Sequence, residues 1–534
     1  MQRKWLGLGS LLLVQGLVTA GCGNSTSNGP AQGGSSVNPT GGSTANGGTP
    51  SAGGSTAVTG GAGSSALGGS ASTGGSGNVS TSGGSVGTTG GSTAAGGSST
   101  GGAPSGGTVA TTGGATATTG GTAQGGAAGG AAGGTAGTAG AGPDLSVEIY
   151  DPTKLPRFDI DLPQASIDLL NQVTSADDPK QDTYVTATLH YGTETVSNIG
   201  LRLKGEGSFQ KLDRKPPFKI KFDEFVPKQE FRGLRRLALN NLWEDPSFIA
   251  ERLAYDVYRA AGLPAPRCNS ALVYVNGTFY GVYANVEAED KTFLKRWFPT
   301  DGGNLYEEGQ KDFVTGAETA FDLETNETVN DRTDLVNLIA AVQGATNPAT
   351  FLTDIGGLLD TTHFLKFTAV EAAVNQWDMY SYTVFYMNNF RLYDDPTSKK
   401  FTFIPWGHDL SMKPFRDSGK PFIKLFALAR QGDTANGRVT SGILFQKCLQ
   451  SPTCKAAYSD AVREVITVWQ GLNLEAAAKR YYDQVKAQVY LDTRKNICCV
   501  TTPITNQQFE DGYQSVLTTI RGRVAALQAD LAAQ

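Results

Sequence analysis

The chain has 534 residues, and its 44 Lys and Arg against 49 Asp and Glu give a formal net charge of −5. A balance this close to neutral, with few clusters of basic and aromatic residues, argues against nucleic acid as a partner. The three histidines, His190, His363 and His408, have no ligand spacing with the six cysteines, which argues against a zinc site.

The first 22 residues have the features of a targeting segment. Arg3 and Lys4 precede an apolar run that ends at Thr-Ala-Gly-Cys, residues 19–22. Small residues just before a cysteine resemble a bacterial lipoprotein cleavage site, which predicts a lipid anchor at Cys22. Secretion without an anchor is the alternative, because Thr19 replaces the usual Leu or Val. In both cases the mature chain is expected outside the cytoplasm.

Residues 23–143 consist of Gly, Ser, Thr and Ala with almost no charge and no aromatic residue. Such a segment cannot bury enough apolar surface to offset its ordering entropy, so it is predicted to be a disordered linker. As a flexible coil of this length it has an r.m.s. span of roughly 60 Å. That span suits a tether that holds a folded domain away from a membrane.

Residues 144–534 have an ordinary globular composition and are long enough for one large or two smaller lobes. We expect a strand-rich N-lobe over about 144–300 and a mainly helical C-lobe over about 301–534.

Five cysteines remain in the folded part, where an oxidising compartment favours disulfides. Cys448 and Cys454 flank a short turn, which predicts a local bridge. Cys498 and Cys499 are adjacent in sequence, so one of them is expected to pair with Cys268 or to stay free.

Alternating apolar and polar residues between Gly and Pro breaks predict strands in the first half of the folded part. Asp-Pro-Ser at 245–247 supplies an N-cap and a first-turn proline for a helix that runs to about Ala261. The Asn-Gly dipeptide at 276–277 predicts a type I′ hairpin turn. The predicted strands are 184–191, 200–204, 218–222, 236–239, 271–275 and 278–286.

The second half is predicted to be mostly helical, with one inserted strand pair, 389–393 and 401–405, joined by a turn that begins at Asp394. A strand-rich lobe followed by helices with a β-insert indicates an α+β fold of two lobes. The predicted helices are 331–343, 363–375, 454–470, 474–490 and 507–531.

Residues 201–222 carry seven basic side chains against two acidic ones, in a chain that is acidic overall. Strand alternation places one set of side chains on an apolar face: Leu201, Leu203, Phe218, Ile220 and Phe222. The opposite face then carries Arg202, Lys204, Lys219 and Lys221. Gly205-x-Gly207-Ser208 forms a turn whose bare backbone allows close approach to an anion. The stretch therefore resembles a phosphate cradle, and a solvated hairpin is the alternative.

Two acidic residues border the predicted strand pair. Asp378 follows the helix that starts at His363, and Asp409 follows the strand that ends at Pro405. The strand pair links the two loops, so both acids are expected to face one cavity together with the basic strands. Phosphoryl transfer needs such a set, because one carboxylate orients the attacking hydroxyl, others hold a divalent metal, and a lysine contacts the phosphate oxygens.

The order of these motifs resembles the CotH kinase family, whose members are atypical, secreted relatives of protein kinases. The match runs from about residue 155 to 415, most of the folded part. The matching stretches are 201–222, 239–241, 245–247, 251–255, 273–277, 280–283, Glu287, 304–306, 377–378, 389–393 and 403–406.

The resemblance implies a two-lobed kinase-like fold, ATP and Mg²⁺ or another divalent cation as cofactors, and a role for each matched residue. Asp378 is the implied catalytic base, and Asn389 and Asp409 are the implied metal ligands. Glu251 is the implied partner of a phosphate-binding lysine, for which Lys219 is the first choice. The implied nucleotide-binding set is Arg202, Lys204, Gly205, Gly207, Ser208, Lys215, Lys219, Lys221, Glu251 and Glu287.

The chain departs from the family pattern at two places. The family commonly has Asp-x-Asp after the Trp at 406, whereas this chain has Gly407-His408-Asp409. Thr383 stands five residues after Asp378, where a kinase loop carries Asn. Asp409 is therefore the remaining acid for the metal, and a pseudokinase is an alternative.

Three functions follow from these features. The first is an extracytoplasmic kinase that phosphorylates Ser or Thr of a surface or secreted protein. The second is a catalytically inactive, surface-anchored binding module, in which Trp243, Trp377 and Trp406 line a groove. The third, a glycosidase that uses Asp378 and Asp409 as its carboxylate pair, leaves the lysine-rich strands without a role.

Overall fold

The computed structural model describes residues 144–383, 386–414, 422–426, 441–498 and 502–534. The predicted signal segment with Cys22 and the predicted linker, residues 23–143, lie outside the described residues. None of the helices in the described part combines the length and the apolar composition that crossing a membrane requires.

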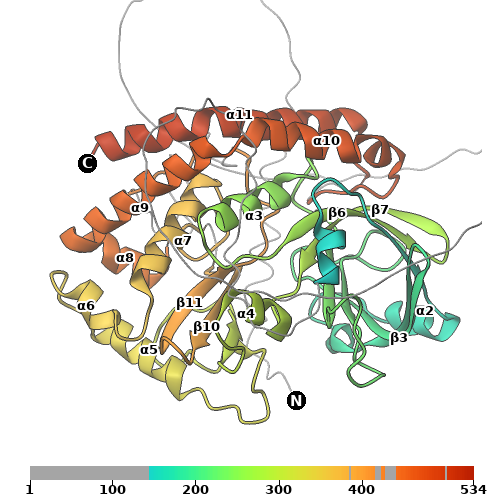
Figure 1. Ribbon diagram of the computed structural model, residues 1–534, viewed down its shortest axis with the longest axis horizontal. Coiled ribbons are helices and arrows are strands. Elements are labelled where there is room, and N and C mark those ends of the chain that lie inside the picture. Colours follow the sequence, from blue (N-terminus) through green and yellow to red (C-terminus); the bar gives the residue numbers. More distant parts are fainter. Residues whose placement is uncertain (1–143, 384–385, 415–421, 427–440, 499–501) are drawn as a thin grey trace, which may run out of the picture. The chain divides into compact units, whose positions relative to one another are not determined.

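Seven strands form a closed barrel in the order β1-β2-β3-β4-β5-β7-β6 (Figure 1). Neighbouring strands are antiparallel except for β1 and β6, whose parallel pairing closes the barrel. The bounds are β1 Arg157–Asp161, β2 Val185–Tyr191, β3 Glu194–Leu203, β4 Phe218–Lys221, β5 Arg236–Asn240, β6 Cys268–Val275 and β7 Thr278–Glu287. Strands were predicted at six of these places, whereas β1 and the closure were not.

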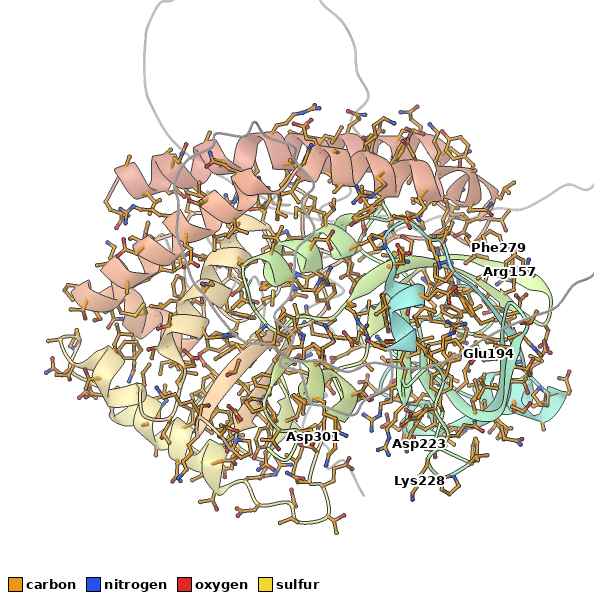
Figure 2. The ribbon with its side chains drawn as sticks, viewed as in Figure 1. Arg157, Glu194, Asp223, Lys228, Phe279 and Asp301 are labelled. Carbon is orange, nitrogen blue, oxygen red and sulfur yellow. A yellow bond between two sulfur atoms is a disulfide. The ribbon has the colours of Figure 1, made fainter. Side chains whose placement is uncertain are left out.

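The barrel interior is filled as the alternation predicted. The five apolar side chains of the predicted inner face are at most 1% exposed. They are Leu201, Leu203, Phe218, Ile220 and Phe222. Polar side chains such as Arg157 of β1 and Glu194 of β3 lie on the outside (Figure 2). The inner core of the barrel is separate from the larger core of the helical part.

The β6–β7 turn is confirmed as a type I′ turn. Asn276 and Gly277 both have positive φ, 47° and 74°, as that turn requires. Two further short helices lie near the barrel strands, α2 (Gln164–Leu170) and the 3₁₀ helix η3 (Pro179–Asp182).

Several side chains hold the segment that leads into the barrel, among them Arg267, Asn285 and above all Asn269. This segment contains the 3₁₀ helix η2 (Leu145–Tyr150) and ends at β1. The amide nitrogen of Asn269, which is completely buried in β6, donates to the carbonyl oxygens of Ile149 (3.3 Å), Asp151 (2.9 Å) and Lys154 (3.0 Å).

Helix α3 spans Ala250–Ala260 and begins about four residues later than predicted. Phe248 has φ of +62°, a left-handed conformation that interrupts the helix after Asp-Pro-Ser. The Asp245 carboxylate still accepts hydrogen bonds near the helix start, from the amides of Ser247 and Ala250 at 2.8 Å each.

The predicted strand pair is confirmed as β10 (Phe390–Asp395) and β11 (Lys400–Pro405). It belongs to a four-stranded sheet in the order β11-β10-β8-β9, which adds β8 (Leu305–Glu307) and β9 (Asp322–Leu323). Helix α7 (Thr361–Ala373) packs on β11. Asn389 immediately precedes β10, and Asp409 lies four residues after the end of β11.

The five predicted helices of the second half are confirmed within two residues at each end, as α5 (Thr333–Gly344), α7, α9 (Pro452–Gly471), α10 (Leu474–Leu491) and α11 (Asn506–Ala532). Four short α-helices were not predicted: α2, α4 (Lys291–Trp297), α6 (Phe351–Ile355) and α8 (Ile443–Gln450). Figure 1 shows α10 and α11 side by side, and α10 also packs against β7, β6 and α3.

The predicted local disulfide is confirmed. Cys448 at the end of α8 and Cys454 at the start of α9 are bridged, with their Cα atoms 5.0 Å apart. Cys268 is buried in β6 and makes no disulfide among the described residues, and Cys499 lies outside them.

Candidate active site

The first part of the candidate site is a lysine and a glutamate joined by an asparagine. Lys204 follows β3, Asn240 ends β5, and Glu251 lies in the first turn of α3. The Lys204 ammonium donates to the amide oxygen of Asn240 at 2.5 Å, and the Asn240 amide nitrogen donates to Glu251 at 2.9 Å. The Lys204 ammonium also lies 4.9 Å from the centre of the Trp406 ring, which connects the barrel to the end of β11.

Burial shifts the pKa values of both charged ends of this chain of hydrogen bonds. The pKa of Lys204 falls to about 8, because burial disfavours its charge and Glu251 only partly compensates. The pKa of Glu251 rises to about 8, through burial first and the charge of Asp409 second. Asn240 thus separates two groups whose ionisation the surroundings weaken.

The second part of the site is built around Asp378, in the loop after α7. Asn389, just before β10, donates through its amide nitrogen to the Asp378 backbone oxygen (2.8 Å) and carboxylate (2.9 Å). Asn388 donates to the same carboxylate at 3.2 Å. The eleven-residue interval that separates Asp378 from Asn389 is therefore no obstacle to their contact.

Asp378 has an unusually high pKa for a carboxyl group, about 7. Burial is the main cause, and the charges of Asp409 and Glu244 add to the rise, while the hydrogen bonds from Asn388 and Asn389 oppose it. A base with a pKa near neutrality holds a proton only loosely at physiological pH, which suits proton transfer.

Asp409 lies beside both parts of the site. Burial raises its pKa, and the ammonium groups of Lys413 and Lys204 oppose that rise. Its carboxylate accepts a hydrogen bond from the backbone amide of Glu244 at 3.2 Å. Because Asp409 acts on the pKa values of both Glu251 and Asp378, the acids of the later loops and the lysine of the early sheet meet in one polar cluster.

His408 takes no part in this cluster as a base. It is completely buried, its ring centre lies 4.8 Å and 4.9 Å from those of Tyr255 and Tyr258, and one ring nitrogen contacts the Ser411 hydroxyl at 3.0 Å. Burial lowers its pKa to about 3, so the ring is neutral.

Gly407 marks the place where the family commonly has an acid. Its φ is +61°, and a Cβ atom there would lie 2.3 Å from the amide oxygen of Asn389. Any larger residue would need a left-handed backbone and a displaced Asn389. In this chain the Asn389 amide occupies the space that a side chain at position 407 would need.

The residues of the cluster fit a divalent cation as a partial ligand set. Asp378, Glu251 and Asp409 all have raised pKa values, because burial disfavours their charged forms, and the charge of Asp409 adds to the rise for the other two. Magnesium is commonly held by one or two carboxylates, with substrate phosphates and water completing the shell. Among the described residues no three acidic, histidine or cysteine side chains are arranged as a complete metal site.

The outward-facing cations of β3 and β4 lie next to this cluster. Arg202 and Lys219 are cross-strand partners, and the charge of Lys219 affects the pKa of Lys204. Arg202 pairs with Asp182 at 3.2 Å and Lys221 with Glu224 at 2.7 Å, so both are engaged at the barrel surface. The structure brings Lys204, and not the first choice Lys219, into contact with the Asn240–Glu251 pair.

Two residues of the predicted nucleotide-binding set are committed elsewhere. Lys215 is 1% exposed and forms an ion pair with Asp492 at 2.7 Å. Glu287 is buried between Arg267, at 2.9 Å, and Arg296. Each of these two side chains is paired with a structural partner and does not face the cluster.

The glycine turn is partly exposed, and its most open position is Gly207. Gly205 has φ of +92°, and its Cβ would lie 2.4 Å from the Ser208 hydroxyl. Gly207 is exposed, with open space around its Cα, and Glu206 accepts a hydrogen bond from Gln310 at 2.8 Å. The turn adjoins Lys204 directly in sequence.

Sequence reasoning missed Asn240, Asn388, Glu244 and Lys413 as members of the cluster. The only signal for Asn240 was its place inside the matched stretch 239–241. Asn388 was passed over although it adjoins Asn389. Two surface cavities, one lined by Phe351 and Lys447 and one by Lys154 and Arg157, include no residue of the cluster.

The chain is similar to several known proteins. Inner spore coat protein H of Bacillus subtilis (strain 168) is 25% identical over 214 residues, which cover 38% of this chain and 56% of that protein. The crystal structure of the Helicobacter pylori proinflammatory kinase CtkA matches 65% of this chain and 91% of its own, with 10% identity and a TM-score of 0.24. The complex of HipA, HipB and operator DNA from Shewanella oneidensis MR-1 matches 71% of this chain and 74% of its own chain, with 11% identity and a TM-score of 0.27.

The relative from Bacillus is spanned over little more than half of its length. The family model described as CotH kinase protein matches residues 201–527, which contain every member of the polar cluster. Since this match covers more than half of the chain, the α+β, kinase-like protein belongs to the CotH kinase family.

Proposed function

We propose that this chain is an extracytoplasmic protein kinase that transfers a phosphoryl group from ATP to Ser or Thr of a surface or secreted protein. The observation that carries the proposal is the polar cluster, in which Lys204, Glu251 and Asp409 adjoin the Asp378–Asn389 pair within a CotH kinase domain. The predicted signal segment and the spore-coat relative support a location outside the cytoplasm.

Asp378 is the proposed base. Its pKa of about 7 lets it accept the proton of a Ser or Thr hydroxyl as the oxygen attacks the γ-phosphorus, whose bond to the bridging oxygen breaks to release ADP. Asn388 and Asn389 orient the carboxylate through their hydrogen bonds of 3.2 Å and 2.9 Å. A carboxylate held by two amides has a fixed direction, so the hydroxyl it binds is oriented as well.

Lys204 is the proposed phosphate ligand. The exposed glycine turn beside it offers backbone amides to the same anion. Asp409 and the Asn389 amide oxygen are the proposed ligands of a divalent cation, which when bound supplies positive charge to the phosphates of ATP. Glu251 then holds Lys204 in place through Asn240.

The test is incorporation of labelled phosphate from ATP into the full chain and into dephosphorylated casein, with and without Mg²⁺. Asp378→Asn keeps the size and most hydrogen bonds of the side chain but removes the base, and we expect at least a hundredfold loss of rate. Asp483→Asn, in an exposed ion pair on α10, is the matched control and should keep full activity. Equal rates in Asp378→Asn and the wild type would refute the proposal.

The alternative, an inactive binding module, is favoured by one observation, the glycine at position 407. The two functions differ in nucleotide binding. A kinase should melt at a higher temperature with ATP and Mg²⁺, because a ligand that binds only the folded state stabilises it. A melting temperature that does not change when ATP and Mg²⁺ are added, together with no phosphate incorporation, would favour the binding module over the kinase.

We also propose a lipid anchor at Cys22 as the attachment to a membrane. The residue lies outside the described part, so the support is the small-residue pattern before the cysteine. Expressed in a bacterium, the full chain should partition into the detergent phase of Triton X-114, and Cys22→Ser should move it to the aqueous phase. Detergent partitioning that Cys22→Ser leaves unchanged would refute the anchor.

A further inference from the structure

We infer that the C-terminal helix pair, α10 and α11, positions two segments of the active site separately. One is the connection 209–217, between the glycine turn and β4. The other is the segment 422–426, downstream of Asp409. The inference rests on the proposed kinase function, because it assigns the first segment to nucleotide binding and the second to acceptor binding.

The first anchor is the residue that ends α10. Asp492 forms its 2.7 Å ion pair with Lys215, and both side chains are 1% exposed. The same carboxylate lies 2.1 Å from where a Cβ atom would stand on Gly281, so only glycine allows β7 to approach it. Such a pair is costly to break from one side, because the remaining charge would be buried alone. It therefore fixes the connection 209–217 against both the barrel and α10.

Arg494 strengthens the first anchor from the surface. Its guanidinium donates to the backbone oxygens of Asp213 (2.5 Å) and Arg214 (2.7 Å) and lies 4.3 Å from the centre of the Tyr280 ring. Two backbone carbonyls of the connection are thus held from the far end of the chain. The connection directly follows Lys204 and the glycine turn. Its position therefore determines where these residues would contact the phosphates of a nucleotide.

The second anchor lies near the end of α11. The Asp530 carboxylate accepts from the backbone amide of Leu425 at 3.1 Å and from the ammonium of Lys424 at 2.6 Å. Arg523, which is completely buried, donates to the backbone oxygen of Ile423 at 3.3 Å and to that of Ala372 at 2.7 Å. Helix α11 therefore ties the segment 422–426 to the end of α7.

The side of the site that this second segment borders follows from its other contacts. Asn375, three residues before Asp378, accepts from the amide of Ile423 at 3.0 Å and donates to the backbone oxygen of Lys413 at 2.7 Å. Tyr382, four residues after Asp378, donates to the backbone oxygen of Leu425 at 3.0 Å. The segment 422–426 thus contacts residues on both sides of Asp378 in the sequence. The acceptor hydroxyl must reach this base.

The two anchors act on different steps, so two variants should give opposite patterns. Arg494→Ala removes two hydrogen bonds from a half-exposed residue, and Asp530→Asn removes one charge whose partner Lys424 is itself half-exposed. Both variants are therefore expected to fold. Asp483→Asn and Glu475→Gln are matched controls, since they remove exposed ion pairs of the same helices.

With dephosphorylated casein as the acceptor, we expect Arg494→Ala to raise the KM for ATP roughly tenfold and to leave the KM for casein unchanged. Asp530→Asn should raise the KM for casein roughly tenfold and leave the KM for ATP unchanged. Tenfold is the factor that corresponds to the loss of one charge-assisted hydrogen bond. Arg494→Lys, which keeps a donor, should restore part of the ATP affinity.

Hydrogen exchange followed by mass spectrometry tests the anchors without any activity. Exchange should accelerate in 209–217 only for Arg494→Ala and in 422–426 only for Asp530→Asn. Unchanged protection in both segments, or equal effects of both variants on both KM values, would overturn the inference. If the wild type incorporates no phosphate the proposed function fails, and the exchange data alone then decide whether the anchors exist.

Discussion

An acid at position 407, where the family commonly has one, should lower the stability of this protein. The sequence alone suggests the opposite. Gly407→Asp and Gly407→Ala both add a Cβ atom at a φ of +61°, 2.3 Å from the Asn389 amide oxygen. The left-handed backbone costs roughly 1 kcal/mol. Moving Asn389 breaks its two hydrogen bonds to Asp378, each contributing about 1 kcal/mol. The free energy of unfolding should therefore fall by roughly 3 kcal/mol.

Gly262→Ala separates the two causes. Gly262 also has a left-handed φ, +77°, but nothing lies within 4 Å of the place where its Cβ would stand. It should lose roughly 1 kcal/mol, for the backbone alone. Urea denaturation of the wild type and the three variants gives the free energies of unfolding directly.

The second readout is Mg²⁺-dependent ATP binding, measured by the shift in melting temperature. Gly407→Asp should bind ATP more weakly than the wild type, because it displaces Asn389 and adds a third charge beside Asp378 and Asp409. A Gly407→Ala variant no less stable than Gly262→Ala would refute the crowding. Stronger ATP binding by Gly407→Asp would refute the proposed role of the Asn389 amide oxygen as a metal ligand.

Three further predictions follow from the site and the fold. Asn240→Leu should reduce ATP affinity roughly tenfold, because Lys204 loses the acceptor that joins it to Glu251; an unchanged ATP-induced melting shift would contradict this. The pKa of Asp378, about 7, lies above that of an unfolded Asp, about 4, so the folded state binds this proton more tightly. The stability of the wild type relative to Asp378→Asn should therefore be highest below about pH 4 and fall as the pH rises through 7. Over the range near pH 7, kcat/KM of the wild type should rise with pH. Stability curves of the two proteins that run parallel would contradict the raised pKa. Replacing Cys448 and Cys454 by Ala should lower the free energy of unfolding by about 2 kcal/mol, as expected for a short loop, and reductant should bring the wild type to the same value and leave the double variant unchanged.

Local patterns in the sequence were sufficient for most elements. The Asn-Gly turn at 276–277 fixed the β6–β7 hairpin, and the alternation over 201–222 identified the inner face of β3 and β4. The start of α3 was misplaced because the left-handed Phe248 leaves no trace in the composition. The barrel closure was missed because it depends on a five-residue strand pairing with another more than a hundred residues later.

The candidate site was predictable in its charges but not in their partners. Lys204, Lys215 and Lys219 are equivalent in the sequence, as basic residues of one cationic stretch. They differ only through residues distant along the chain: Asn240 for Lys204, and Asp492, 277 residues away, for Lys215. Glu287 likewise matched a family stretch, yet Arg267 and Arg296 neutralise it. Long-range pairing of this kind is decided by the fold and has no local signature.

The contacts that hold the leading segment to the barrel, including those of Asn269, determine how the domain responds to a pulling force. A pull on the chain ahead of residue 144 would first strain the ion pair of Asp144 with Arg267 (2.9 Å), and then the hydrogen bonds that Asn269 makes to the segment 149–154. Force that passes them would reach β1, which is held on both sides by its neighbours in the barrel. Strands β3 to β5, which position Lys204 and Asn240, do not pair with β1. Force applied to the leading segment is therefore taken up by these contacts before it reaches the polar cluster.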